Sequence, residues 1–222
     1  MNNYHTRQLG IVNPNLLNIS ITVIGAGGIG SWATLALAKM GCSRLTVWDG
    51  DKVAPENIGS QLYGEKHIGR PKPEALASII SDLAVITIAP VNQVWNGQPL
   101  NSSIVIVAVD NMKTRKTIWN KIKLTQTVQW YIEARMAQEL IRLYTIKMTD
   151  QEGHALYEKT LYDDKKTDPI PCTERAVVYN TLACGSLITR QVKDIATDQM
   201  DSWPWEVIFD LSTLIIIERG RP

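Results

Sequence analysis

The stretch ISITVIGAGGIGSWATLALAKMGCSRLTVWDGDKVAPENIGSQLYGEKHIGRPK, Ile19–Lys72, decides the fold of this 222-residue chain. An apolar run, Ile19–Ile24, leads into a glycine-rich turn, and an apolar-periodic segment at residues 31–40 follows the turn. A second apolar run then ends in Asp49. This order predicts a strand, a tight turn, a helix and a second strand closed by an acid, which is typical of a nucleotide-binding α/β unit.

The glycine-rich turn has the spacing G-x-G-x-x-G, and its glycines are Gly25, Gly27, Gly28 and Gly30. The first glycine makes the tight turn, the second lets the backbone approach a phosphate, and the third lets the helix pack against the strand. Backbone N–H groups at the helix start then face an anion. Asp49 lies where a carboxylate can accept hydrogen bonds from a ribose. The alternative is a tight strand–helix turn without a ligand.

The composition bounds the class of protein. A formal net charge of +1, without a long run of like charges, gives no indication of a nucleic-acid partner. Three cysteines do not make a disulfide framework, so a reduced, cytoplasmic setting is the simpler interpretation. The N-terminus lacks the apolar run of a signal peptide, and every apolar run is far shorter than the roughly 18 residues of a membrane helix. We expect one soluble, cytoplasmic domain spanning residues 1–222.

Strand-like and helix-like segments alternate along the chain. Further strands are predicted at residues 85–91, 103–109, 128–134 and 140–147, and further helices at residues 73–83, 112–122 and 174–195. This alternation predicts an α/β fold of Rossmann type, with a mostly parallel central sheet flanked by helices. Two β-branched runs near the end of the chain predict an antiparallel C-terminal extension. The polar residues 149–172 predict a long crossover loop.

Three of the predicted strands end in residues that suit a ligand site, namely Gly25, Asp49 and Asp110. In open parallel sheets, ligands bind beyond the carboxyl ends of the strands. Three segments that are far apart in the sequence are therefore predicted to meet at one crevice.

Several motifs together resemble the ThiF/MoeB/HesA family, the adenylating relatives of ubiquitin-activating enzymes. In chain order, the matching motifs are Arg7-Gln8, the glycine turn, Asp49-Gly50-Asp51 with Asn57 and Gln61, Gly69-Arg70-Pro71-Lys72, and Asp110-Asn111 with Arg115. The resemblance implies an ATP- and magnesium-dependent enzyme that adenylates a C-terminal glycine carboxylate and releases pyrophosphate. The carboxylate would belong to a small ubiquitin-like or sulfur-carrier protein, or to a peptide.

The resemblance also implies a role for each matched residue. Asp49 would bind the ribose, Lys72 the phosphates, and Asp110 the magnesium ion, which prefers oxygen ligands. Arg7 would reach the γ-phosphate from the partner subunit of a homodimer, and Arg115 would brace the helix or loop beside it. Further nucleotide contacts would come from the glycine turn and from Asp51, Asn57 and Gln61. The alternatives are solvated side chains at Asp49, Lys72 and Arg7, and a helix N-cap at Asp110.

The three cysteines differ in their surroundings. Cys172 precedes a predicted helix, whose dipole lowers a thiol pKa, so it is a candidate nucleophile for thioester formation or sulfur transfer. The alternative is an ordinary small loop residue. Cys42 and Cys184 are interpreted as packing residues. No pair has the C-x-x-C spacing found in many relatives, so we expect no structural zinc.

The sequence departs from the family pattern at Ser60, where the family carries an arginine. A serine cannot supply that charge, so either another cation replaces it, with Arg70 the nearest candidate, or adenylation is impaired. The second hypothesis is therefore a catalytically impaired subunit of a heterodimeric activating enzyme. A third, a nicotinamide-dependent dehydrogenase, suits the glycine turn but leaves Lys72 and Asp110 without a role.

Overall fold

A single eight-stranded sheet organises the computed structural model, which describes residues 3–162, 176–200 and 204–220. The strand order is β3-β2-β1-β4-β5-β6-β7-β8. The strands are β1 Ser20–Ile24, β2 Arg44–Trp48, β3 Ala89–Val91, β4 Ile104–Val107, β5 Trp130–Ala137, β6 Leu140–Lys147, β7 Glu206–Asp210 and β8 Ile215–Arg219. The helices are α1 Gly28–Met40, α2 Lys72–Leu83, α3 Met112–Ile122, α4 Gln151–Lys159 and α5 Val178–Ala196, with short 3-10 helices η1 Asn3–Gln8, η2 Pro14–Leu17, η3 Pro55–Asn57 and η4 Glu65–His67.

The sheet has a parallel half and an antiparallel half. Strands β3, β2, β1, β4 and β5 pair in parallel, and β6, β7 and β8 continue the sheet with antiparallel pairing. The predicted Rossmann-like sheet with an antiparallel C-terminal extension is therefore confirmed. All residues of β4 are buried, as expected for a central strand that is covered on both faces.

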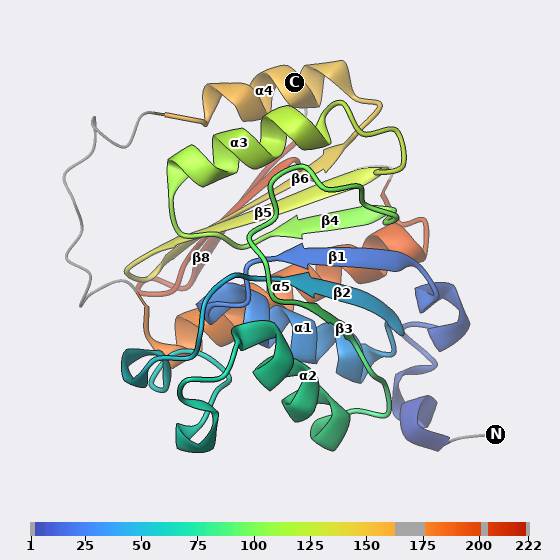
Figure 1. Ribbon diagram of the computed structural model, residues 1–222. Helices are drawn as coiled ribbons and strands as arrows, with labels where there is room; N and C mark the ends of the chain where they lie inside the picture. The colour runs from blue at the N-terminus through green and yellow to red at the C-terminus, as the bar shows by residue number, and fades with distance from the viewer. Residues whose placement is uncertain (1–2, 163–175, 201–203, 221–222) are drawn as a thin grey trace.

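Helices cover both faces of the sheet and enclose two apolar cores. In Figure 1, helices α1, α2 and α5 lie below the sheet, and α3 and α4 lie above it. Buried side chains from α1, α2 and α5 pack against one face of β1, β2 and β4. Those from α3 and α4 pack against the opposite face around Trp119. None of the helices in the described ranges is long and apolar enough to cross a membrane.

The prediction of one long loop over residues 149–172 is wrong in its first half, because α4 occupies Gln151–Lys159. Few apolar residues mark this helix, and tertiary contacts stabilise it instead. The ring of Tyr157 packs edge-on against Trp119 at 4.7 Å between centroids, and the Trp119 indole N–H donates to Glu158 at 2.9 Å. Residues 163–175 lie outside the described part of the chain.

Two predicted elements, starting at residues 85 and 174 in the sequence pattern, begin four residues later in the structure. Edge strand β3 begins at Ala89 and not at residue 85. Helix α5 begins at Val178, because Val177 is an extended N-cap with φ −118° and ψ 154°. Loop residues 51–69 contain the two short helices η3 and η4.

Candidate functional site

The carboxyl ends of β1, β2 and β4 lie side by side, as predicted. Strand β1 pairs with both neighbours, so Ile24 stands opposite Trp48 on one side and Val107 on the other. The chain leaves these strands through Gly25, Asp49 and the segment 108–110 (Figure 1). Three segments with ligand-binding side chains or backbone therefore meet at one edge of the sheet.

The three glycines of the G-x-G-x-x-G pattern are not all required for the same structural reason. Gly25 has φ +101°, and a Cβ atom there would lie 2.5 Å from the Ala108 carbonyl oxygen. A Cβ atom on Gly30 would lie 1.8 Å from the Gly25 carbonyl oxygen. A Cβ atom on Gly27, by contrast, would meet no atom of the described residues within 4 Å. Packing therefore requires Gly25 and Gly30, whereas Gly27 borders open space that a ligand could enter.

The N-terminus of α1 receives no side-chain cap from its N-cap residue. Gly27 is the N-cap and has no side chain to accept a hydrogen bond, and the first turn contains no acidic residue. The first N–H groups of a helix lack intrahelical acceptors, and they carry partial positive charge from the helix dipole. This end of α1 can therefore hold a phosphate group.

Asp49 holds the glycine turn in place. One carboxylate oxygen accepts a hydrogen bond from the Ala26 N–H at 2.7 Å, and the other accepts one from the Asp51 N–H at 2.8 Å. Each carboxylate oxygen has a second acceptor position. The half-buried Asp49 can therefore brace the turn and still accept hydrogen bonds from a ribose.

Lys72 is buried at the first residue of α2 and forms an ion pair with Asp51, with 3.1 Å between Nζ and Oδ2. The Lys72 side chain is 9% exposed, so the alternative of a solvated lysine is wrong. Its partner Asp51 is 73% exposed, which makes it a replaceable partner. An ammonium has three donors, so Lys72 could contact a phosphate, with Asp51 holding the lysine in place.

Hydrogen bonds to the Ser60 backbone carbonyl hold the segment around Ser60 in place. The Ser60 carbonyl accepts hydrogen bonds from the Trp32 indole and the Thr181 hydroxyl, both at 3.0 Å. Asn57 accepts a hydrogen bond from the Ala54 N–H at 2.9 Å, which caps η3. The Gln61 side-chain oxygen is buried and has no hydrogen-bond partner among the described residues. Asn57 thus has a local structural role, and Gln61 keeps an acceptor that a ligand could satisfy.

Tyr63 is a site residue that no sequence pattern marked. Its hydroxyl donates to the Ala26 carbonyl of the glycine turn at 2.6 Å and lies 3.4 Å from the Lys72 carbonyl. Burial, followed by the nearby charge of Asp49, raises the pKa of this hydroxyl, so it remains a donor. Tyr63 therefore connects the glycine turn to the start of α2, where Lys72 lies.

Asp110 is exposed, and its carboxylate accepts a hydrogen bond from the Asn111 side chain at 3.0 Å. The N-cap of α3 is Asn111, which accepts from the Thr114 N–H at 2.8 Å, so the interpretation of Asp110 as the N-cap is wrong. Behind it, the buried Arg115 donates to the Val109 carbonyl and pairs with Glu133 at 2.6 Å, which is the expected bracing role.

At the carboxyl end of β4, Asp110 offers an exposed carboxylate to a metal ion. No group of three or more His, Cys, Asp or Glu in the described ranges could hold a metal. Mg²⁺ is commonly bound by one or two carboxylates together with substrate phosphates. Asp110 therefore fits a magnesium ion that arrives with a nucleotide, and it does not fit a resident metal.

Arg7 does not join the other site residues within one chain. It is exposed on η1, which is attached to the far end of α1 by a hydrogen bond from Gln8 to the Met40 carbonyl at 2.6 Å. Helix α1 has 13 residues, so about 20 Å separates this end from the glycine turn. Beside η1, a groove of about 580 Å³ runs between α1 and α5, with Ile11, Trp32 and Leu182 in its lining.

The described cysteines are packing residues, as expected. Cys42 and Cys184 are fully buried, and burial raises the pKa of each thiol to about 12. Cys172 lies outside the described residues.

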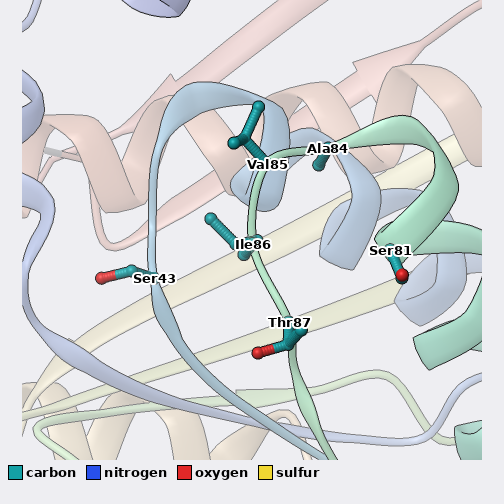
Figure 2. A pocket seen from close by; sticks show the side chains of 6 residues that line it. All are labelled: Ser43, Ser81, Ala84, Val85, Ile86 and Thr87. Carbon is teal, nitrogen blue, oxygen red and sulfur yellow. The ribbon is translucent and has the colours of Figure 1, made fainter. Parts of the chain in front are cut away.

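A second groove lies away from the crevice. It is lined by Ser43, Ser81 and residues 84–87 (Figure 2). Ser43 immediately precedes β2, so this groove is at the amino edge of the sheet. Ligands of parallel sheets bind at the carboxyl edge, which excludes it as the nucleotide site.

The fold and the glycine turn together define an α/β protein with a Rossmann-like sheet. The model of the ThiF family matches residues 11–201, and the chain belongs to this family. Over 113 residues it is 37% identical to the tRNA threonylcarbamoyladenosine dehydratase of Haemophilus influenzae, which covers 44% of this chain and 41% of that protein. Over 110 residues it is 32% identical to the molybdopterin-synthase adenylyltransferase of Salmonella typhimurium, which covers 46% and 44%.

The match therefore spans less than half the length of these two curated relatives. Solved structures extend the likeness over the whole chain. Escherichia coli MccB with ATP has a TM-score of 0.74 at 15% identity, covering 100% of this chain and 71% of that one. PaaA has a TM-score of 0.73 at 18% identity, covering 98% and 68%. At these identities the structures establish the fold.

Proposed function

We propose that this chain is an ATP- and magnesium-dependent adenylyltransferase that activates the C-terminal carboxylate of a small ubiquitin-like or sulfur-carrier protein, or of a peptide. The observation that carries the proposal is the open space in front of Gly27 at an uncapped helix N-terminus. Such a space suits a phosphate, and relatives with matching sequence are named adenylyltransferases.

The chemistry requires cations more than a base. A carboxylate oxygen attacks the α-phosphorus of ATP, the bond between the α-phosphorus and the bridging oxygen breaks, and pyrophosphate leaves with the negative charge. Two anions must approach each other, so positive charge fixed near the phosphates lowers the barrier. Lys72 would supply a fixed point charge, and a magnesium ion held by Asp110 would neutralise phosphate charge. Asp49 would orient the ribose.

A homodimer would complete this site. Helix η1 is attached to the end of α1 that lies about 20 Å from the glycine turn, so we infer that Arg7 contributes to a second chain's site. Mixing Arg7→Ala with Asp110→Ala subunits tests the idea, because a mixed dimer contains one site with both residues. Recovered activity supports the shared site, and no recovery contradicts it.

The charge missing at Ser60 leaves an alternative open. We propose that Arg70, which is exposed and follows Gly69, supplies a substitute charge. The competing proposal is a catalytically impaired subunit of a heterodimer. Arg70→Ala should slow pyrophosphate exchange if Arg70 substitutes, and an unchanged rate removes Arg70 from the proposal.

A second candidate substrate is a carboxylate on transfer RNA, because several of the matching relatives are named tRNA threonylcarbamoyladenosine dehydratases. The formal net charge of +1 favours the protein or peptide substrate, since RNA binding usually uses a basic surface.

ATP–pyrophosphate exchange separates these possibilities. The full chain is assayed with magnesium and either a small protein ending in Gly-Gly, a peptide, or transfer RNA. Exchange with a protein or peptide supports the first proposal, and exchange with transfer RNA alone supports the second. ATP binding without exchange under any condition supports the impaired subunit. Lys72→Met should strongly slow exchange, whereas Lys66→Met, which removes an exposed lysine, should retain it.

A further inference from the structure

A buried charge cluster lies directly behind the Asp110 turn, and its centre is Glu133. Glu133 is 0% exposed and stands opposite Val107 in the sheet, two residues before the chain reaches Val109. Its carboxylate pairs with two arginines, Arg115 at 2.6 Å and Arg135 at 2.7 Å. One anion therefore holds two cations inside the protein.

The first arginine connects Glu133 to the Asp110 turn. Arg115 is 7% exposed, and its guanidinium bridges the Glu133 carboxylate and the Val109 carbonyl. Because Val109 immediately precedes Asp110, this bridge fixes the direction in which the chain enters the turn. The position of the Asp110 carboxylate thus depends on where Glu133 holds Arg115.

The second arginine connects Glu133 to the end of α4. Arg135 donates to the Thr160 carbonyl at 2.9 Å and to the Thr160 hydroxyl at 3.0 Å. Its guanidinium lies 4.6 Å from the centre of the Tyr144 ring and 5.8 Å from that of Tyr157. The Tyr157 hydroxyl donates to Glu133 at 2.8 Å. The C-terminal end of α4 is therefore attached to the same carboxylate.

We propose that Glu133 is a positioning residue that couples the Asp110 turn to the C-terminal end of α4. A change at Thr160 is transmitted through Arg135 and Glu133 to Arg115 and so to Asp110. A buried carboxylate with two arginines cannot release one of them without leaving a charge poorly compensated, so the two arms shift together. The importance of Asp110 for magnesium rests on the proposed function, whereas the coupling itself does not.

The test uses two conservative variants, Arg115→Lys and Arg135→Lys, which keep the charge and lose the planar fork that reaches two partners. Arg219→Lys is the matched control, because Arg219 on strand β8 also pairs with a buried carboxylate of the same sheet, that of Glu206 at 3.0 Å. Amide hydrogen exchange of the nucleotide-free protein is measured over residues 108–112 and 157–162. It needs no enzymatic activity.

Coupling predicts that each variant raises exchange in both segments, while β1 exchanges as in the parent. The control variant should change neither segment. If Arg115→Lys affects only residues 108–112 and Arg135→Lys affects only residues 157–162, the two arms are independent and the proposal is wrong. Thr160→Val, which removes one hydroxyl contact, serves as a milder perturbation of the α4 arm should a lysine variant fail to fold. It should also raise exchange at residues 108–112.

A second readout joins the coupling to magnesium. In pyrophosphate exchange, both lysine variants should raise the half-saturating magnesium concentration about fivefold, and the double variant should raise it less than the product of the two. If the double variant raises the half-saturating magnesium concentration by the full product of the two single effects, the coupling is contradicted. If the parent protein catalyses no exchange, the proposed function fails, and the hydrogen-exchange result still decides the coupling.

Discussion

Alanine substitutions at two glycines of the turn should separate ligand binding from packing. At Gly30, the new Cβ atom would lie 1.8 Å from the Gly25 carbonyl oxygen, where ordinary C···O contacts need more than about 3 Å. Since both partners are backbone, α1 must shift relative to β1. Overpacking of this kind typically costs about 1–3 kcal/mol. We expect Gly30→Ala to lower the free energy of unfolding by about 3 kcal/mol.

Gly27→Ala should behave differently. Gly27 has φ −80°, which any residue can adopt, and within the described part of the chain its Cβ atom would meet nothing within 4 Å. As an N-cap, alanine is worse than glycine by about 1 kcal/mol or less. The added methyl group would occupy the space that a phosphate must enter. We therefore expect ATP to bind at least about tenfold more weakly, a loss of about 1.4 kcal/mol.

Calorimetry can measure both effects on the same samples. For a chain of 222 residues, the loss at Gly30 should lower the melting temperature by about 6–12 °C, and the loss at Gly27 by less than about 4 °C. Titration with ATP and magnesium then gives the dissociation constants. Gly10→Ala is the control, because a Cβ atom there also meets nothing within 4 Å and Gly10 lies beside η1, at the far end of α1.

Two results would refute this reasoning. If Gly27→Ala binds ATP as tightly as the parent, the open space at the helix N-terminus is not where phosphates approach. If the melting temperature of Gly30→Ala equals that of the parent, the close contact between α1 and the turn is not rigid.

Three further results are expected. Lys72→Met should lower the rate of pyrophosphate exchange at least about 100-fold, because it removes a fixed charge beside the phosphates; parallel initial-rate assays of parent and variant check this. Ellman's reagent should modify at most one of the three thiols in the folded chain, because Cys42 and Cys184 are buried, and all three in denaturant. Burial lowers the pKa of His67 below its ordinary 6.5, so stability should fall as the pH drops below about 6.5, where the unfolded chain binds the proton more readily. His67→Gln should reduce that fall in urea midpoints measured at about pH 7.5 and 5.5.

The sequence predicted most of the fold because the signals are local. Helix α3 lies at residues 112–122, as predicted, and its buried residues Met112, Arg115, Ile118, Trp119 and Ile122 repeat with helical spacing. Helix α4 was missed, because its stability comes from Tyr157 and Glu158 against Trp119, a residue on another helix. A contact between segments leaves no periodic signal in either one.

The same distinction applies to the site. Asp49, Lys72 and Asp110 belong to motifs, and the parallel sheet places their segments at one edge. Tyr63 and Glu133 act through partners that are distant in the sequence, and Tyr63 is 37 residues from Ala26. Their side chains are ordinary until the fold is known. Asp51 was predicted as a nucleotide contact, and the structure adds its ion pair with Lys72.

At Ser60, the backbone determines the shape of the site, and the side chain determines its charge. The Ser60 carbonyl accepts hydrogen bonds from Trp32 and Thr181, so this segment is held against α1 and α5 whatever side chain it carries. A serine therefore leaves the form of the crevice intact and lacks only the charge that an arginine would bring. Loss of charge weakens phosphate neutralisation in the transition state more than it weakens recognition of the ribose and backbone. An impaired subunit should therefore still bind ATP and fail in pyrophosphate exchange, whereas an active enzyme must bring a cation from Arg70 or from a second chain.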